Sequence, residues 1–196
     1  SNWGVSKDTT IEIEVFEIPD IKFSVKHACE DEDLTILNNT QISSGTISYA
    51  WNYGDGTTGN TGASSHTKRY AKPGGYKITL RATANGCESV ASRNANQFAR
   101  PTAAFTAAPE CIGSVTQFTN TSTIELNERI GSYWSFGDGE VGTLSDPGHI
   151  YQTPGSKTVK LLAVSQFGCS DSTEQNIVIK DGPIASFTYD KACNVD

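Results

Sequence analysis

The sequence has no methionine, three histidines and no long apolar run, and each shortage narrows the classes of protein that the chain can be. No stretch approaches the roughly 20 apolar residues that cross a bilayer, so we expect no membrane insertion within it. The first residues, SNWGVSKDTT, lack the charged start and apolar centre of a signal peptide. We therefore expect no anchoring or targeting signal in these residues.

Basic residues are also scarce. The chain has 15 Lys and Arg against 22 Asp and Glu, a formal net charge of −7. Nucleic-acid binding depends on clustered Lys and Arg at the phosphates, and the one local basic cluster is Lys68, Arg69 and Lys72. We interpret this cluster as a solvated surface and expect no nucleic-acid partner.

Groups that could perform catalysis are equally few. A nucleophilic Ser or Cys needs a His that a carboxylate orients, but the histidines are His27, His66 and His149, and neither GxSxG nor HExxH occurs. We therefore expect no enzyme activity in this segment and no bound cofactor. The acidic run at 30–33 makes Asp31 and Asp33 weak candidates for calcium ligands, although such a run is more often a solvated loop.

What the sequence does contain is a repeat of 82 residues. Phe23, Phe105 and Phe187 are separated by this step, and so are three prolines and two sets of cysteines. Those residues are Pro19, Pro101 and Pro183, then Cys29, Cys111 and Cys193, then Cys87 and Cys169. The period predicts two full repeats at 18–99 and 100–181. Residues 1–17 then correspond to the final strand region of a preceding repeat, and 182–196 to the start of a following one.

Within each repeat, apolar and polar residues alternate over short segments, which is the period of a half-buried strand. One such segment places apolar side chains on one side, at Tyr76, Ile78, Leu80 and Ala82, and another does so at Val159, Leu161 and Ala163. No window shows a sustained helical period. Short strands between turn signals predict an all-β sandwich with almost no helix.

The strongest local signal is a six-residue motif that occurs once in each repeat, as WNYGDG at 51–56 and WSFGDG at 134–139. The residues that define it are Trp51, Tyr53, Gly54, Asp55 and Gly56 in the first copy and Trp134, Phe136, Gly137, Asp138 and Gly139 in the second. The tryptophan and the next aromatic face the same side of a strand, so they should fill the core. Gly-Asp-Gly favours a tight turn, and we interpret its aspartate as holding that turn rather than as a metal ligand or catalytic group.

These motifs closely resemble the W-x-F-G-D-G signature of PKD (polycystic kidney disease) domains. The later segments YAKPGGYKITL and HIYQTPGSKTVKL are similar to the family's H-x-Y-x-x-P-G-x-Y-x-V-x-L stretch. The resemblance implies tandem immunoglobulin-like β-sandwiches of about seven strands. Lys68 stands where the family often has His, and Lys157 where it often has Tyr. Neither His149 nor Tyr76 is therefore expected to be an indispensable functional group.

The five cysteines form no CxxC pair, so disulfides are a better interpretation than a metal or redox site. Four cysteines in two repeats allow three connectivities. Repetition favours Cys29–Cys87 and Cys111–Cys169, one bridge within each repeat, and leaves Cys193 without a partner. Structural disulfides predict an oxidising, extracellular compartment.

Disulfide-bearing PKD repeats resemble those of large Bacteroidetes cell-surface adhesins, including proteins of gliding motility exported by type IX secretion. This implies a non-catalytic stalk or adhesive segment that contacts neighbouring repeats and a protein or carbohydrate surface ligand. The alternative is an accessory spacer or polymer-binding module of a secreted hydrolase such as a chitinase or protease. A row of exposed aromatics would favour that alternative, but the strong aromatics are predicted to lie in the cores. A eukaryotic receptor ectodomain is a third interpretation.

Overall fold

The computed structural model describes residues 4, 10–182 and 185–188. The chain divides into two compact units, Ser1–Phe98 and Ala99–Asp196, and each is described here by itself. Across the described residues the regular structure consists of strands and one three-residue 3₁₀ helix, η1, at Glu125–Asn127. The prediction of an all-β fold is confirmed.

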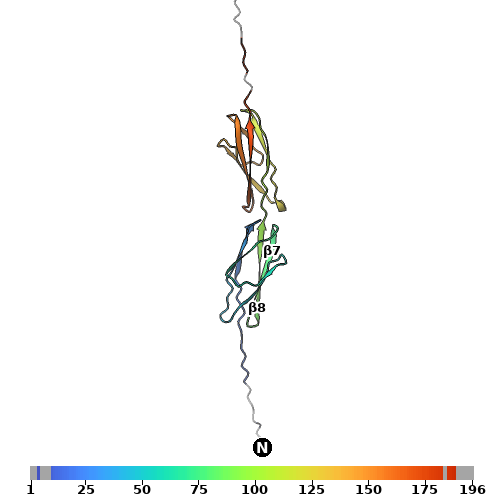
Figure 1. Cartoon of the computed structure of the whole chain (residues 1–196). Coiled ribbons are helices and arrows are strands. Elements are labelled where there is room, and N and C mark those ends of the chain that lie inside the picture. The colour runs from blue at the N-terminus through green and yellow to red at the C-terminus, as the bar shows by residue number, and fades with distance from the viewer. Residues whose placement is uncertain (1–3, 5–9, 183–184, 189–196) are drawn as a thin grey trace, which may run out of the picture. The chain divides into compact units, whose positions relative to one another are not determined.

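The first unit contains eight strands in two sheets, one with the order β1-β3-β6 and the other with the order β2-β8-β7-β4-β5. The strands are β1 (Phe23–Lys26), β2 (Ala28–Cys29), β3 (Leu34–Asn38), β4 (Ser48–Asn52), β5 (Thr58–Gly59), β6 (Ser65–Lys68), β7 (Gly74–Ala84) and β8 (Cys87–Phe98). The two longest strands, β7 and β8, form an antiparallel hairpin (Figure 1). Its turn is Asn85-Gly86, with both residues at positive φ, the conformation that short hairpin turns favour.

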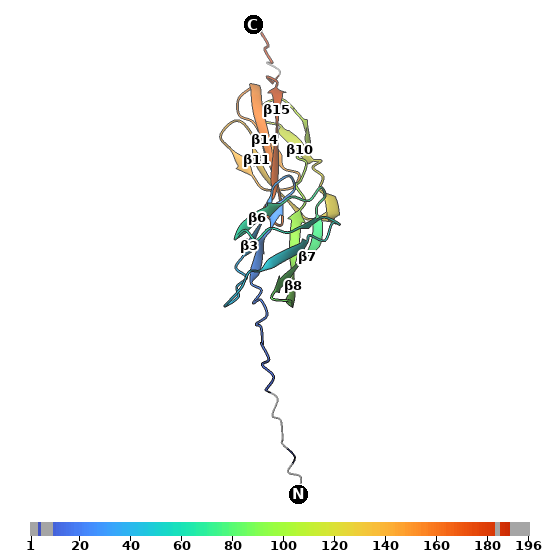
Figure 2. The same cartoon turned by 60° about the horizontal axis from the view of Figure 1, so that its bottom comes forward.

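The second unit contains seven strands, with the orders β13-β10-β9 and β12-β11-β14-β15. The strands are β9 (Phe105–Ala108), β10 (Val115–Asn120), β11 (Ile130–Ser135), β12 (Val141–Gly142), β13 (Gly148–Ile150), β14 (Gly155–Ser165) and β15 (Ser170–Ile179). Figure 2 shows β11, β14 and β15 side by side in the larger sheet. The expectation of sandwiches with about seven strands is confirmed.

Alternation along the central strands builds each core between its two sheets. In β7, Ile78, Leu80 and Ala82 are fully buried, whereas Lys77 before them and Arg81 between the last two are exposed. The first core joins Phe23, Leu34, Ile36, Trp51, Tyr53, Tyr70, Ile78, Leu80 and Ala95. The second core joins Phe105, Phe118, Trp134, Phe136, Tyr151, Val159, Leu161, Ile177 and Ile179. Each large apolar side chain buried in this way contributes about 1.5–3 kcal/mol.

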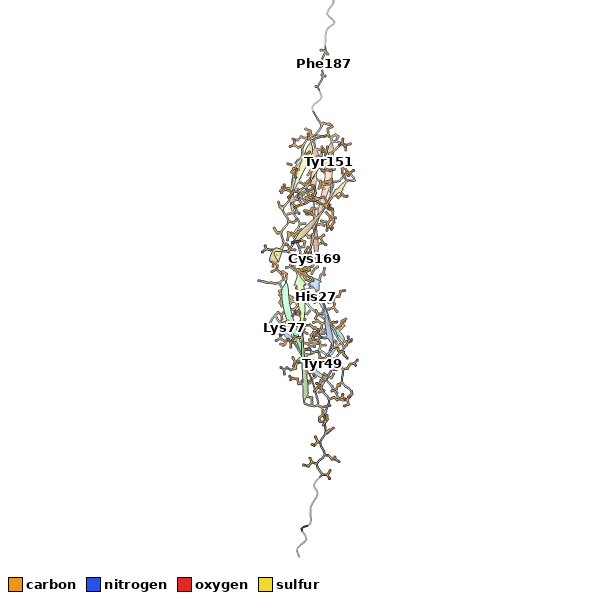
Figure 3. All side chains as sticks on the ribbon, turned by 180° about the vertical axis from the view of Figure 1, so that it is seen from behind. His27, Tyr49, Lys77, Tyr151, Cys169 and Phe187 are labelled. Atoms are coloured by element: carbon orange, nitrogen blue, oxygen red, sulfur yellow. The ribbon has the colours of Figure 1, made fainter. Side chains whose placement is uncertain are left out.

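In each unit the chain enters at one end and leaves at the other. An early segment runs parallel to the last strand at the point where that strand ends, pairing Cys29 with Phe98 in the first unit and Cys111 with Lys180 in the second. We call the end where the chain enters the proximal end and the end where it leaves the distal end. Figure 3 shows Tyr151 and Cys169 towards opposite ends of the second unit.

Residues 10–17 form no strand, and the side chains of Ile11, Ile13 and Val15 are exposed. An extended segment needs a neighbouring strand to pair its backbone groups, and no pairing of these residues occurs within the part of the chain that the structure describes. Most of the remaining residues of 1–17 and 182–196 lie outside the described ranges. Their assignment to neighbouring repeats stays a prediction.

Candidate functional site

The aromatic pair of each W-x-aromatic-G-D-G motif lies in a core. Trp51 and Tyr53 stack with ring centroids 6.5 Å apart, and Trp134 and Phe136 repeat this geometry at 6.4 Å. The indole N–H of Trp51 donates a hydrogen bond of 2.9 Å to the carbonyl of Thr61, and that of Trp134 makes an equivalent 2.9 Å bond. Burial of the large rings is therefore achieved without leaving the indole nitrogens unpaired.

The first glycine of each motif packs directly against the neighbouring strand. Gly54 has a φ of +82°, and a Cβ placed on it would lie 2.8 Å from the backbone oxygen of Lys77. Gly137 has a φ of +80°, and its Cβ would lie 2.5 Å from the oxygen of Thr158. The second glycine also has positive φ but faces open space. Both conformation and close approach therefore require glycine at the first position.

In the first unit, the carboxylate of Asp55 holds the turn and forms an ion pair with a lysine side chain. One carboxylate oxygen, Oδ1, accepts hydrogen bonds from the backbone N–H and the hydroxyl of Thr57, at 3.0 and 2.6 Å. The other, Oδ2, lies 2.7 Å from Nζ of Lys68, whose side chain is only 16% exposed. Burial alone would raise the pKa of Asp55, but the bonds from Lys68 and Thr57 outweigh it and lower the pKa to about 2.

This ion pair corrects the interpretation of Lys68, one of the three residues of the basic cluster, as part of a solvated surface. Lys68 Nζ also lies 5.3 Å from the ring centre of Tyr53 and 5.2 Å from that of Tyr70, distances at which a cation is attracted to an aromatic face. Arg69 next to it does remain solvated, with 56% exposure and an ion pair to Asp33 at 2.8 Å. Lys68 is the last residue of β6 and points towards the rings, whereas Arg69, the residue after the strand, points away from them.

The second unit uses a histidine in the same place. Oδ1 of Asp138 accepts the backbone N–H of Glu140 at 3.1 Å, and Oδ2 lies 2.7 Å from Nε2 of His149. The imidazole stacks on Phe136 with centroids 4.2 Å apart. Burial would raise the pKa of Asp138, but the hydrogen bonds from His149 and Glu140 lower it overall.

A buried tyrosine completes each turn. The hydroxyl of Tyr70 donates to the carbonyl of Tyr53 at 2.7 Å, and that of Tyr151 donates to the carbonyl of Phe136 at 2.9 Å. Burial raises the pKa of both phenols, and the nearby aspartate charge raises it further. The carboxylates, rings and hydroxyls of the motif are thus engaged with one another, which favours the interpretation of the aspartates as turn-holding groups.

Sequence reasoning missed Lys68 and His149 as the partners of these aspartates. The signal was available, because Lys68 lies two residues before Tyr70 and His149 two residues before Tyr151. Two different side chains that can donate to a carboxylate therefore occupy one position of the repeat. Because Lys stands at this position in one repeat and His in the other, the two residues did not look equivalent in the sequence.

The proposed calcium ligands lie in the turn that follows β2. Asp31 has a φ of +65°, and the carboxylate of Asp33 is bound by Arg69. Within residues 4, 10–182 and 185–188, no group of three or more His, Cys, Asp or Glu side chains is arranged to hold a metal ion. Calcium binding at Asp31 and Asp33 stays a prediction.

The predicted disulfide pairs Cys29–Cys87 and Cys111–Cys169 are wrong. Cys29 and Cys169 are each disulfide-bonded, but Cys87 and Cys111 carry free thiols. Cys87 begins β8 and Cys29 pairs with Phe98 at the other end of the same strand, so 11 residue steps separate them, about 35 Å at the usual rise. A disulfide requires Cα atoms within about 7 Å.

The second unit shows the same separation. Cys169 immediately precedes β15, and Cys111 pairs with Lys180 just beyond its end, again 11 residue steps or about 35 Å away. The last strand of each unit therefore runs the length of the sandwich between the two cysteines. The prediction of disulfide bonding in the chain is confirmed, while the pairing within a repeat is excluded by geometry.

With this geometry in place, the chain can be compared with known proteins. The model of the PKD domain family matches residues 18–97 and 98–180, so the chain belongs to the PKD domain family and carries two tandem copies. The resemblance drawn from the motifs is confirmed. PKD domains are non-catalytic modules that occur in secreted, extracellular proteins.

Relatives include a collagenase and a metalloprotease. The chain is 32% identical over 76 residues to collagenase ColA of Bacillus cereus, covering 38% of this chain and 8% of ColA. It is 30% identical to the PKD1 domain of the Vibrio cholerae metalloprotease PrtV, covering 42% of this chain and 99% of that domain with a TM-score of 0.39. The chain thus spans less than a tenth of the length of the curated relatives it matches.

The fold is also similar to the immunoglobulin domains of a cell adhesion molecule. The eight N-terminal domains of the Down Syndrome Cell Adhesion Molecule match with a TM-score of 0.56 at 14% identity, covering 85% of this chain and 25% of that one. At this identity the likeness concerns the fold alone. Among the described residues, no helix has the length and apolar character needed to span a membrane.

Proposed function

We propose that residues 18–180 act as a non-catalytic stalk segment of a secreted cell-surface protein. The observation that carries this proposal is the path of the chain through each unit, which it enters at one end and leaves at the other. A 12-residue strand such as β8 advances the chain by about 40 Å. Each repeat therefore adds reach, which suits a protein that must display another domain away from its anchor.

The way in which each unit is tied together suits a segment under tension. The early segment is held to the last strand by parallel pairing, with the N–H of Glu30 donating to the carbonyl of Phe98 at 2.7 Å and that of Ile112 to Lys180 at 3.0 Å. Force applied to the two ends of a unit would slide these paired segments past each other, so their hydrogen bonds would resist together. This supports a role in which the segment resists pulling force, as in a surface adhesin or a surface protein of gliding motility.

A second candidate is a polymer-binding module of a secreted hydrolase, and the match to collagenase ColA favours it. An aromatic residue on a strand that could contribute to such binding is Tyr133, which lies on the outer face of β11 and is 53% exposed. The corresponding residue of the first unit is Ala50. A single exposed ring on the face of β11 is a small platform for a polymer.

Sedimentation with insoluble polymers separates the two candidates. The chain is mixed with fibrillar collagen, chitin or cellulose, and the bound fraction is measured after centrifugation over a range of polymer amounts. The stalk role predicts no saturable binding to any of them. Saturable binding to one polymer that is lost in Tyr133→Ser and retained in Tyr49→Ser would overturn the stalk role in favour of the polymer-binding module.

A further inference from the structure

Each repeat carries one cysteine at each of its ends. Cys87 lies at the proximal end of the first unit, where its sulfur is 3.8 Å from the carbonyl oxygen of Phe16 in the incoming segment. Cys111 lies at the distal end of the second unit, beside Lys180. Both thiols are free and partly exposed, so a partner can reach them.

The equivalent positions in the other unit are oxidised. Cys169 stands at the proximal position that Cys87 occupies, and Cys29 at the distal position that Cys111 occupies, and both are disulfide-bonded. Each of the two positions therefore forms a disulfide in one copy of the repeat. The two cysteines of one repeat lie about 35 Å apart, at opposite ends of the unit, so neither can be the disulfide partner of the other.

We propose that Cys87 and Cys111 are linking cysteines, each of which forms a disulfide with another PKD repeat that lies outside residues 18–180. Chain connectivity brings the distal end of one repeat to the proximal end of the next. Cys87 therefore pairs with a distal-end cysteine of a preceding repeat, and Cys111 with a proximal-end cysteine of a following one. Such bridges would make a stalk resistant to separation of its repeats. The inference goes beyond the stalk role and stands even if the chain binds a polymer.

The surroundings of Cys111 position it for this reaction. The residue after it, Ile112, donates its N–H to Lys180 at 3.0 Å, and Gly113 donates its own to Tyr151 at 3.0 Å. The bond to Lys180 ties the cysteine to the distal end of the last strand, where the chain leaves the unit, and the bond to Tyr151 ties it to the residue that follows β13. The thiol is thus held at a fixed place on a folded end rather than on a free loop.

The chemistry needs a disulfide oxidant, for which oxidised glutathione serves. The thiolate of Cys87 attacks one sulfur of the glutathione disulfide, forms a mixed disulfide and releases one reduced glutathione. The thiolate of Cys111 from another chain then attacks the Cys87 sulfur and releases the second glutathione. Two protein thiols are oxidised to one disulfide, and one glutathione disulfide is reduced to two thiols.

The proposal is tested with the full chain, in which a second copy stands for the neighbouring repeat. All samples carry Cys193→Ser, because Cys193 lies outside the described residues and would add a third thiol. Two matched variants, Cys87→Ser and Cys111→Ser, are incubated with oxidised glutathione separately and as an equal mixture. A chain concentration of about 1 mM matches the effective concentration of modules joined by a short linker.

The mixture is expected to form a covalent dimer joined by Cys87 and Cys111, at least ten times more than either variant alone, as measured by non-reducing electrophoresis and peptide mass spectrometry. The protein with both thiols is expected to form a ladder of longer oligomers. Equal dimerisation of the separate variants would overturn the proposal, because the thiols would then react without end-to-end recognition. It would also be overturned if no sample dimerised while maleimide labelled both thiols fully.

Discussion

The two units build the same turn but hold its aspartate with different side chains. In the first unit Lys68 reaches Asp55 from above two tyrosine rings, and in the second His149 reaches Asp138 while stacked on Phe136. The N···O distance is 2.7 Å in both. The comparison teaches that this position needs a donor to the carboxylate that can also lie on an aromatic face, and that both amine and imidazole meet this need.

The units differ more at the position two residues before Lys68 and His149, which is His66 in the first unit and Pro147 in the second. His66 of the first unit lies with its ring centre 4.9 Å from that of Trp51, and both ring nitrogens are buried without a hydrogen-bond partner among the described residues. Burial lowers the pKa of His66. The second unit has the buried Pro147 there. A titratable group beside the core tryptophan of one unit thus corresponds to a buried apolar residue in the other.

The largest effect is expected from the turn glycines, which the two units share. Gly54→Ala and Gly137→Ala should each lower the free energy of unfolding by about 3 kcal/mol, because a methyl group would collide with the backbone of the next strand. Gly56→Ala and Gly139→Ala are the matched controls and should cost about 1 kcal/mol, from positive φ alone. Urea unfolding measures all four. Equal losses at all four positions would show that close approach has no part in the requirement.

The tyrosine hydroxyls should matter next, and equally in both units. Tyr70→Phe and Tyr151→Phe each remove a buried hydrogen bond to a turn carbonyl, so each should destabilise its own unit by about 1–2 kcal/mol. Hydrogen exchange at the indole N–H of Trp51 or Trp134 reports each unit separately. Tyr133→Phe, on an exposed ring, is the control that should change nothing. A loss confined to one unit would mean that the two turns are not equivalent.

The ion pair of the first unit should appear as a loss of stability in acid. The folded-state pKa of Asp55, about 2, lies below its ordinary value of 3.8, so its contribution is present above pH 4 and is lost as the pH falls from about 4 to 2. Lys68→Met should move the pKa of Asp55 back towards 3.8 and reduce stability at pH 7 by about 1 kcal/mol. Carboxyl chemical shifts followed by NMR measure this pKa. Lys72→Met is the control, and a similar pKa in both variants would contradict the assigned cause.

The smallest effect is expected at His66. Because burial lowers the pKa of this imidazole below its ordinary 6.5, the unfolded chain binds more protons, and the first unit should lose stability as the pH falls below 6.5. His66→Leu should remove this fall, because leucine does not titrate. The second unit, with Pro147, serves as the internal control in the same sample. An unchanged pH profile in His66→Leu would place the sensitivity elsewhere.

Much of the fold could be predicted from the sequence, because the signals were local and occurred twice. The two-residue alternation of Ile78, Leu80 and Ala82 predicted which faces of the strands are buried, and the structure buries all three. The paired motifs likewise predicted the family and the sandwich. The turn glycines could be recognised as tolerant of positive φ, but the strand that they touch could not, since Gly54 and Lys77 are far apart in sequence.

Two features were decided by the tertiary structure alone. A repeat of 82 residues is satisfied equally by disulfides within repeats and by disulfides from one repeat to another, and only the path of the last strand shows that the two cysteines of a unit lie about 35 Å apart. The sequence likewise suggested that Lys68 is solvated, because it gives the charge of the side chain but not the direction in which the side chain points. The side chain's place over Tyr53 and Tyr70 follows from strand register and sheet packing. The sequence by itself therefore determined which motifs and cysteines recur, because periodicity is a property of the chain. The tertiary structure decided which side chains are close enough to bond, because that depends on distances within the folded sandwich.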